Sequence, residues 1–553
     1  MLRPLFLACI AALTVAAAPA AAAVAPGRVA FSVATQVPER NVDAGGAGPA
    51  VALPDGGVVM IAHGPGADLT LVQLRADGSL DPSFGSGGVA RVALPGSDRY
   101  NPAQLLRRAD GRLLVVGTGF AAASRFELPR FVLVGLTAAG GLDPSFGAGG
   151  IGPLDLQSSC GGGCTPAALA PDGSIVITGN TGQLSPAIAT DPTAGSDLQW
   201  VVRRLTASGA TDPAFGTVPV SGPAGVSTAG YSTVVRPSGA IVVLGIRARQ
   251  PQLAGLTASG APDPSFNGGA LAPVPVDAPF GILLRADDAI DVAGRDGLVR
   301  FTPSGTIGAS YGTGGFVSFG GFNRSYGPPA MLATPDGGTI LYGLRQFEPT
   351  PAAQPRLQLQ RVTRSGTLGA AGTLSPAFGG GIASRRGGVE QNAFRAGLVP
   401  RADGSYLAVG GLSVVRYTGE GEGFSAGYVA AAAYTPLLEP DTSFGGPQPP
   451  ARARVLLPRQ RARSAAELRR VLVRVRTSGA GLVQLRVRDG RGRILAQDVA
   501  AIYAAGTTTV RIPLTTTGRR ILRRGRSIGV RIGRDFRDVL TARDRGVTSG
   551  RLR

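Results

Sequence analysis

The motif Asp-Pro-Ser-Phe-Gly constrains this chain more than any other feature, because it returns along most of the sequence. Its aromatic position is occupied in turn by Phe84, Phe146, Phe215, Phe266, Tyr311, Phe378 and Phe444. Intervals of 45 to 69 residues separate these positions. A period of this length is typical of repeat architectures. The sequence therefore predicts seven units, numbered 1 to 7 in chain order.

A second feature of each unit is a turn dipeptide between apolar runs. The dipeptides are Asp55-Gly56, Asp110-Gly111, Asp172-Gly173, Ser238-Gly239, Asp336-Gly337 and Asp403-Gly404, with Asp287-Asp288 as a weak copy. They suit the positive φ angles of tight hairpin turns. A third strand before the motif and a short one after it, as at residues 89–92, make four strands per unit. Such units predict the blades of a propeller, whose closed ring protects the sheet edges.

The complete pattern, an Asp-Gly hairpin followed by Gly-x-Leu-Asp-Pro-Ser-Phe-Gly-x-x-Gly, resembles the delta-60 repeat over residues 45–446. That family is found in bacterial secreted and surface proteins and is understood to form β-propellers. The resemblance implies a seven-bladed propeller over residues 26–446, with no catalytic residues and no shared ligand. Unit 5 departs most from the pattern, with Asp287-Asp288 at the turn and Tyr311 at the aromatic position.

The ends of the repeat region suggest how the ring closes. Residues 27–33 match the strand expected after a motif, whereas the seventh motif runs into the Pro-rich residues 447–450. We therefore expect the N-terminal strand to complete the last blade. The alternative is that residues 27–45 are a loose leader.

The first 25 residues have the pattern of a secretory signal peptide. A basic start is followed by an apolar run and by small residues that end in Ala23-Val24-Ala25. A retained membrane anchor and a lipoprotein attached at Cys9 are the alternatives, although the apolar run is shorter than a bilayer span requires. The expected location is secreted or cell-surface, outside the cytoplasm, with the signal peptide cleaved.

Two further cysteines, Cys160 and Cys164, flank three glycines. In an exported protein a local disulfide between them is the expected state. A metal site would need more thiols or imidazoles, and the single histidine, His63, is remote in sequence.

The charge is concentrated in the C-terminal part of the chain. Residues 1–450 hold 29 Arg and 29 acidic residues, and residues 451–553 hold 26 Arg and 6 acidic residues, which accounts for the net charge of +20. We expect a Pro/Arg-rich linker at residues 447–468. Alternation of Val with Arg then predicts half-buried strands over residues 469–553, with a helical turn or two within 514–524. This segment resembles the Arg-rich immunoglobulin-like modules of secreted actinobacterial proteins, which implies a basic β-sandwich.

The candidate site residues have structural explanations. The motif carboxylates, Asp81, Asp143, Asp212, Asp263 and Asp441, are expected to cap local backbone N–H groups, and a ring of metal ligands is the alternative. The motif aromatic residues are expected to pack between strands or blades. One histidine limits any nucleophilic relay, and the paired Glu420 and Glu422 lie in a Gly-rich loop. No catalytic, cofactor-binding or metal-binding residue is assigned.

The sequence favours an exported, non-enzymatic, all-β propeller that presents loops for a ligand or protein. The insertions at residues 121–128, 183–196 and 346–354 are the expected binding loops. The alternatives are a secreted hydrolase or lyase that uses carboxylates on a propeller face, and a purely structural surface protein. The basic C-terminal domain is expected to contact an anionic cell-wall polymer or membrane surface, or only to aid solubility. The lack of interleaved aromatic residues disfavours nucleic acid.

Overall fold

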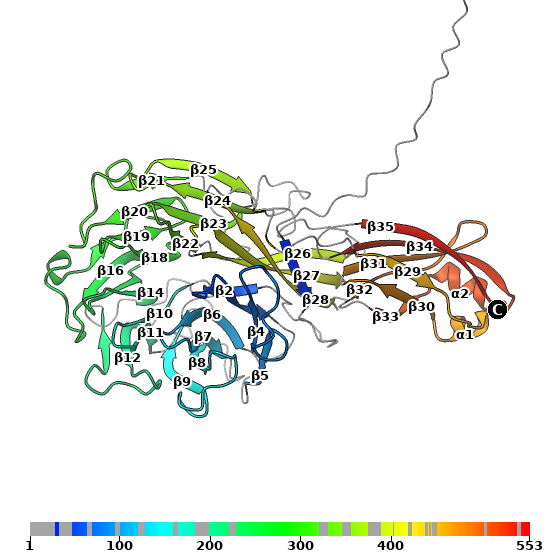
Figure 1. Cartoon of the computed structure of the whole chain (residues 1–553), viewed down its shortest axis with the longest axis horizontal. Coiled ribbons are helices and arrows are strands. Elements are labelled where there is room, and N and C mark those ends of the chain that lie inside the picture. Colours follow the sequence, from blue (N-terminus) through cyan, green and yellow to red (C-terminus); the bar gives the residue numbers. More distant parts are fainter. Residues whose placement is uncertain are drawn as a thin grey trace, which may run out of the picture.

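The computed structural model describes residues 28–32, 47–63, 69–94, 100–119, 128–158, 164–182, 198–220, 228–319, 330–345, 356–373, 389–401, 403–417, 423–436, 441, 444, 451–479, 481–502, 506–538 and 543–553. These residues form strands almost throughout (Figure 1). The repeat units follow one another on one side of the molecule in Figure 1, and two further sheets lie at the C-terminal end.

Units 1 to 4 each contain four antiparallel strands, and each Asp-Gly or Ser-Gly dipeptide turns between the first two strands. Unit 1 has β2 (Ala47–Ala52), β3 (Val58–His63), β4 (Leu69–Leu74) and β5 (Val89–Val92). Unit 2 has β6 (Tyr100–Arg107), β7 (Leu113–Gly119), β8 (Arg130–Leu136) and β9 (Ile151–Gln157). Unit 3 has β10 (Ala167–Leu169), β11 (Ile175–Thr181), β12 (Gln199–Leu205) and β13 (Thr217–Pro219). Unit 4 has β14 (Thr228–Val235), β15 (Ile241–Arg247), β16 (Gln250–Leu256) and β17 (Ala272–Pro273).

Units 5 to 7 follow the same plan. Unit 5 has β18 (Gly281–Leu284), β19 (Ile290–Ala293), β20 (Gly297–Phe301) and β21 (Phe316–Ser318). Unit 6 has β22 (Ala330–Ala333), β23 (Thr339–Arg345), β24 (Arg356–Val362) and β25 (Leu368–Thr373). Unit 7 has β26 (Val389–Pro400), β27 (Tyr406–Tyr417) and β28 (Gly423–Tyr434), and its fourth strand is β1 (Arg28–Ser32).

The pairing of β1 with β28 joins the two ends of the repeat region. Arg28 stands opposite Ala432 in this antiparallel pair. Units 1 and 7 also share one hydrophobic core, in which the ring of Phe444 packs against the turn residue Gly78. The guanidinium of Arg401 donates to the carbonyl oxygen of Ala76 across the same junction, at 2.7 Å. The expectation that the N-terminal strand completes the last unit is confirmed.

The motif aromatic ring of one unit fills the space beside a turn glycine of the next. Phe146 of unit 2 packs in this way against Gly209 of unit 3, whose φ is +85°. A Cβ atom at Gly209 would come within 2.6 Å of Phe146 Cζ, so only glycine fits this approach. The equivalent pairs are Phe84 with Gly140, Phe215 with Gly260, Phe266 with Gly305 and Phe444 with Gly78. The buried motif rings therefore act as wedges between consecutive units.

Two sheets form the C-terminal region. One contains β29 (Ala453–Leu456), β30 (Arg470–Thr477) and β33 (Gly506–Pro513), and the other contains β31 (Gly481–Asp489), β32 (Ile494–Ile502), β34 (Ile528–Asp538) and β35 (Arg543–Leu552). Their inward Val, Leu and Ile residues share one core, while the intervening Arg residues point outward. Two short helices, α1 (Ala462–Glu467) and α2 (Thr516–Leu522), also contribute to that core.

The expected linker at residues 447–468 needs correction from Ala453 onward. Strand β29 pairs with β30, and Ala453 and Val455 are buried in the core. Helix α1 adds Ala462, Ala465 and Ala466 to the same core. Residues 453–467 therefore belong to the C-terminal region, because small and branched apolar residues between the arginines supply a buried face.

Several residues named from the sequence lie outside the described part of the chain. They are residues 1–25, Cys160, Phe378, Glu420, Glu422, residues 183–196 and 346–354, and all of residues 121–128 except the last. No helix in the described ranges is long and apolar enough to cross a membrane.

Candidate functional site

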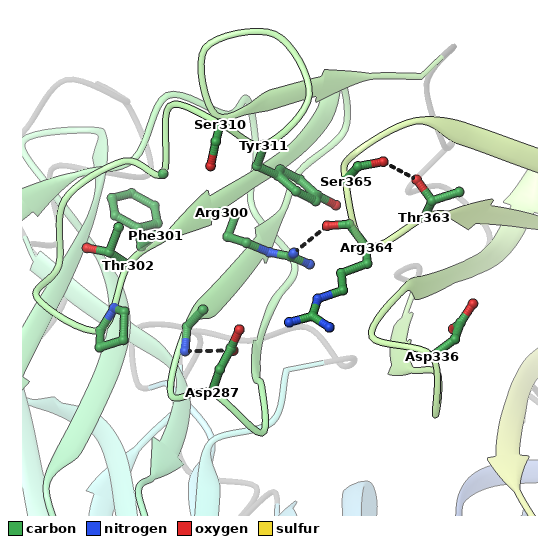
Figure 2. A pocket seen from close by; sticks show the side chains of 13 residues that line it. Asp287, Arg300, Phe301, Thr302, Ser310, Tyr311, Asp336, Thr363, Arg364 and Ser365 are labelled. Atoms are coloured by element: carbon green, nitrogen blue, oxygen red, sulfur yellow. Dashed lines mark hydrogen bonds between the residues drawn. The ribbon is translucent and has the colours of Figure 1, made fainter.

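A cavity of about 700 Å³ opens between units 5 and 6, at the end of the strands where the Asp-Gly turns and the motif turns lie (Figure 2). Unit 5 contributes Asp287, Arg300, Thr302, Gly308, Ser310 and Tyr311, and unit 6 contributes Asp336, Thr363, Arg364 and Ser365. This volume lies in the range of small-molecule pockets. The cavity is therefore the candidate site of this molecule.

A buried carboxylate, Asp291 of β19, fixes the position of the lining residue Arg300, which we call the floor of the site. Its side chain is 0% exposed and accepts two hydrogen bonds from Arg300, from Nε at 2.7 Å and from Nη2 at 2.9 Å. Thr339 Oγ1 of unit 6 also donates to Asp291, at 2.8 Å. On the other side Arg285, only 6% exposed, lies 3.7 Å from the same carboxylate and donates to the carbonyl of Gly338 at 2.7 Å. The cluster thus ties unit 5 to unit 6.

This cluster is specific to unit 5 because of one register position. Asp291 stands directly opposite Arg300 in the sheet, and the same position in unit 3 is Val176 opposite Arg204. Val176 is fully buried, so unit 5 places a charge where unit 3 has a core side chain. A buried charge is tolerated only when it is paired and hydrogen-bonded, which Asp291 is.

Arg300 and Tyr311 stack on each other at the floor. The guanidinium carbon of Arg300 lies 3.9 Å from the centroid of the Tyr311 ring. Burial alone would lower the pKa of Arg300, but its hydrogen bonds to Asp291 outweigh that effect and raise it. Burial raises the pKa of Tyr311 above its usual value. Within the described residues the buried Tyr311 hydroxyl has no hydrogen-bond partner.

The motif turn of unit 5 has lost its carboxylate. In unit 2, Asp143 Oδ1 accepts from Ser145 N at 3.0 Å and from Ser145 Oγ at 2.7 Å. Gly308 replaces this Asp in unit 5, and Ser310 takes the place of Ser145. Across the described ranges, neither the amide nor the hydroxyl of Ser310 has a hydrogen-bond partner, and Figure 2 shows its side chain directed toward the space beside Arg300.

Two carboxylates and one guanidinium form the rim. Asp336 accepts from the hydroxyl of Thr334 and from Arg361 Nη2 at 2.6 Å, and these bonds hold its pKa below the ordinary value. Arg364 lies with its stem against Gly337, and in Figure 2 its guanidinium reaches between Asp287 and Asp336. Its guanidinium has no hydrogen-bond or ion-pair partner among the residues that the structure describes.

This arrangement is suited to binding a polar ligand. Serine and threonine hydroxyls, an unpaired guanidinium and ionised carboxylates converge on one cavity. A general acid would need a carboxyl group whose pKa is raised toward neutrality, and the shift of Asp336 has the opposite sign. No set of three or more His, Cys, Asp or Glu residues in the described ranges is placed to hold a metal ion.

The motif residues lie in the turns rather than in a common centre. Asp81, Asp143, Asp212 and Asp263 each accept from the backbone amide two residues later. Asp441 donates its amide to the carbonyl of Ala433. The described motif rings are buried at separate junctions, namely Phe84, Phe146, Phe215, Phe266, Tyr311 and Phe444. Cys164 is nearly buried, and since Cys160 is not described the disulfide remains a prediction.

The binding loops predicted from the sequence and the candidate cavity lie at opposite ends of the strands. The insertions at residues 121–128, 183–196 and 346–354 connect second to third strands, and the cavity lies at the opposite end. Sequence signals for the cavity did exist, because the weak turn Asp287-Asp288, Gly308 and Tyr311 all fall in the same unit. Asp291 inside an apolar strand is a further signal that we did not use.

One family model matches the chain, over residues 56–84, and it describes a β-propeller domain of unknown function (DUF5122). The repeat region has a β-propeller fold. No curated protein matches the chain.

Three solved structures that resemble the propeller each share 9–10% sequence identity with it. An α-L-arabinofuranosidase of Fusarium graminearum is 10% identical, with 57% of this chain and 93% of that chain covered and a TM-score of 0.35. Prolyl oligopeptidase B of Galerina marginata is 9% identical, with 82% and 56% covered and a TM-score of 0.36. The subtype N11 neuraminidase-like protein of A/flat-faced bat/Peru/033/2010 is 10% identical, with 63% and 88% covered and a TM-score of 0.28. Likeness at this level carries no argument about activity.

Proposed function

We propose that this protein is an exported, non-enzymatic propeller of seven delta-60-like blades that binds a small polar ligand in the cavity between units 5 and 6. The observation that carries the proposal is the convergence of Ser310, Arg364 and Asp336 on a cavity whose floor is fixed by buried ion pairs. The four-stranded sheets and the β1–β28 pair support the ring of seven. Export also accounts for the signal peptide pattern and for a disulfide between Cys160 and Cys164.

The rival proposal, a hydrolase or lyase, uses the same carboxylates differently. It requires one of Asp287 or Asp336 to exchange a proton with the substrate. The downward pKa shift of Asp336 and its ion pair with Arg361 favour a fixed anion that accepts hydrogen bonds. Binding is therefore the better supported function.

The test is a combined binding and turnover screen of the mature protein on neutral sugars, sugar acids, amino acids and short peptides. We expect a ligand that binds without turnover, and that the Arg364→Ala variant binds at least tenfold more weakly. Arg75→Ala removes the same charge from the corresponding turn of unit 1, so it is the matched control and keeps full affinity. Turnover that is lost in Asp336→Asn would establish the rival instead.

We further propose that the C-terminal region holds the protein to an anionic wall polymer or membrane surface. On one sheet Arg454 stands directly opposite Arg476, and on the other Arg488 stands opposite Arg531. All four side chains belong to exposed residues. Like charges directly opposite one another destabilise a sheet, and an anionic surface would relieve that repulsion.

The full-length protein tests this role with two quadruple variants at these four positions. Arg→Gln should weaken binding to anionic vesicles or teichoic acid several-fold, whereas Arg→Lys keeps the charge and should keep most of the affinity. Binding should fall steeply with salt, because the Debye length is only about 8 Å at physiological ionic strength. Unchanged binding by the Gln variant, or indifference to salt, would leave the region a solubilising module.

A further inference from the structure

The motif turns of units 1 to 4 are built to hold a carboxylate. In each turn the Asp oxygen accepts the amide of the residue two positions later, at 2.9 to 3.1 Å. Side chains from the same sheet add donors: Gln73 Nε2 donates to Asp81 at 2.7 Å, Arg112 Nη1 to Asp143 at 2.9 Å and Arg204 Nε to Asp212 at 2.7 Å. The hydroxyls of Ser145 and Ser265, which donate to Asp143 and Asp263, act together with these donors to stabilise the ionised form, so the pKa of every one of these Asp residues is lowered.

Unit 5 keeps the same turn but lacks its carboxylate. The amide of Gly308 still donates to the carbonyl of Arg300, and that of Tyr311 to the carbonyl of Gly308, as the motif residues do elsewhere. The turn therefore has the shape of the other four. Its donors at Ser310 are left without an acceptor within the described residues, and they line the cavity.

Two arginines line the same cavity as the unit 5 turn. Arg300 occupies the place of Arg204, which binds the motif carboxylate of unit 3. A guanidinium carries five N–H groups, and three of Arg300 are engaged, two with Asp291 and one with the carbonyl of Arg364. Arg364 lies on the far side of Arg300 from Ser310 in Figure 2, and its guanidinium has no partner among the described residues.

We propose that the unit 5 turn binds the carboxylate of a small organic acid, such as a sugar acid, in the place that the Asp side chain occupies in units 1 to 4. The inference rests on the cavity being a ligand site and names the chemistry of its ligand. The carboxylate accepts from the amide and hydroxyl of Ser310, and the guanidinium groups of Arg300 and Arg364, which line the same cavity, supply positive charge. The uncharged remainder of the ligand occupies the cavity toward Thr302, Thr363 and Ser365.

The charges around the cavity permit this anion. Arg285, Arg300, Arg361 and Arg364 carry four positive charges. The carboxylates are Asp287, Asp291 and Asp336, and two of these are paired, Asp291 with Arg300 and Asp336 with Arg361. Among the charged residues that line the cavity, Arg300 and Arg364 balance Asp287 and Asp336, so the lining carries no net negative charge that would repel an anion.

The decisive variant is Gly308→Asp, which restores the motif carboxylate and fills the proposed subsite from within. Gly308 tolerates a side chain, since a Cβ there would meet nothing closer than 3.5 Å. Galacturonate and galactose are the matched probes because they differ in a carboxylate, and acetate tests the carboxylate alone. Titration calorimetry should show galacturonate binding at least tenfold more tightly than galactose. Gly308→Asp should lose this preference, and Gly308→Ala should keep it.

Ser310→Ala provides a second measurement if Gly308→Asp does not fold. It removes one of the donors at Ser310 and should weaken galacturonate several-fold without affecting galactose. The carboxylate subsite is overturned if neither galacturonate nor acetate binds, if galactose binds as well as galacturonate, or if Gly308→Asp binds galacturonate like the wild type. If a neutral ligand binds in that case and its binding still depends on Arg364, the cavity remains a binding site and only the proposed carboxylate subsite is wrong.

Discussion

Units 3 and 5 place an arginine at the same register position and use it in different ways. In unit 3, Arg204 donates from Nε to the motif carboxylate of Asp212, and the residue opposite it in the sheet is Val176. In unit 5 the motif carboxylate is gone, and Arg300 turns instead to Asp291, the residue opposite it. Moving one carboxylate from the turn to the core thus keeps the arginine paired while it opens the turn to solvent.

Units 2 to 7 each carry an arginine at the contact with the next unit, which we call the junction arginine. Its position in the sequence of unit 5 explains why that unit needs a buried acid. Units 2, 4 and 7 carry their arginine just before the hairpin turn, at Arg108, Arg236 and Arg401, each stacked on the motif ring. Units 3 and 6 carry it on the third strand, at Arg204 and Arg361. Unit 5 has both, Arg285 and Arg300, within one small volume. Asp291 is the counter-charge that makes this pair tolerable.

The largest effect should come from Asp291→Ala. It leaves Arg285 and Arg300, 6% and 13% exposed, without their buried partner. Breaking a buried ion pair in this way lowers the free energy of unfolding by about 3–5 kcal/mol. Val176→Ala, at the same register in unit 3, should cost only about 2 kcal/mol. Denaturant unfolding of both variants tests this difference, and equal losses would mean that the cluster in unit 5 does not hold the junction.

The next largest difference should be in the stability lost on replacing a turn glycine, at the junction of units 5 and 6 compared with that of units 3 and 4. A Cβ at Gly366 would lie 2.3 Å from the backbone nitrogen of Gly312, whereas one at Gly260 would meet the ring of Phe215 at 2.9 Å. Both residues have positive φ angles, near +84° and +90°. Because a ring moves more easily than backbone, Gly366→Ala should cost about 2–3 kcal/mol and Gly260→Ala about 1–2 kcal/mol. A larger loss for Gly260→Ala in thermal unfolding would reverse the ranking.

Low pH should loosen the motif turn of unit 2, where Asp143 accepts hydrogen bonds, and should not affect the motif turn of unit 5, where Gly308 replaces the Asp. Hydrogen bonds from Ser145 and Arg112 lower the pKa of Asp143 in the folded state. A lowered pKa stabilises the fold fully above the unfolded value, about 3.9 for Asp, and this stability is lost as the pH falls through the folded value. Hydrogen exchange, corrected for the intrinsic rate, should show residues 142–147 losing protection below about pH 4. Residues 307–312 should keep their protection in this pH range. The Asp143→Asn variant should remove the pH dependence of exchange at residues 142–147.

The smallest effect should come from Tyr311→Phe. This variant restores the usual motif aromatic residue and removes a buried hydroxyl that lacks a partner in the described part of the chain. We expect a gain of about 1 kcal/mol. Phe266→Tyr, the reverse change in unit 4, should lower stability by a similar amount or more. If Tyr311→Phe is destabilising, its hydroxyl has an acceptor, and the unit 5 junction is less different from its neighbours than proposed.

The repeats were predictable because their turn and motif residues form local turns and hydrogen bonds that every unit needs. Closure was predictable too, since residues 27–33 have the pattern of a missing fourth strand. The site was not, because Arg300 and Asp291 meet only through strand register, and Arg364 arrives from the next unit. The linker was misjudged for a related reason. Ala453 and Val455 lie among prolines and arginines in the sequence, and only the pairing of β29 with β30 shows that they are buried in the core.

The pairing of β1 with β28 has a consequence for the order of assembly. Strand β1 precedes all other strands of the repeat region, so Arg28 emerges before them when a chain is made or threaded from its N-terminus, and its partner Ala432 emerges only after units 1 to 6. Unit 7 is then the last to form, because the β1–β28 contact joins residues far apart in the sequence, and such contacts are slow to make. Until that moment the first blade presents an open flank to any neighbouring chain. Truncated or stalled copies would therefore associate with one another, whereas full-length chains would not.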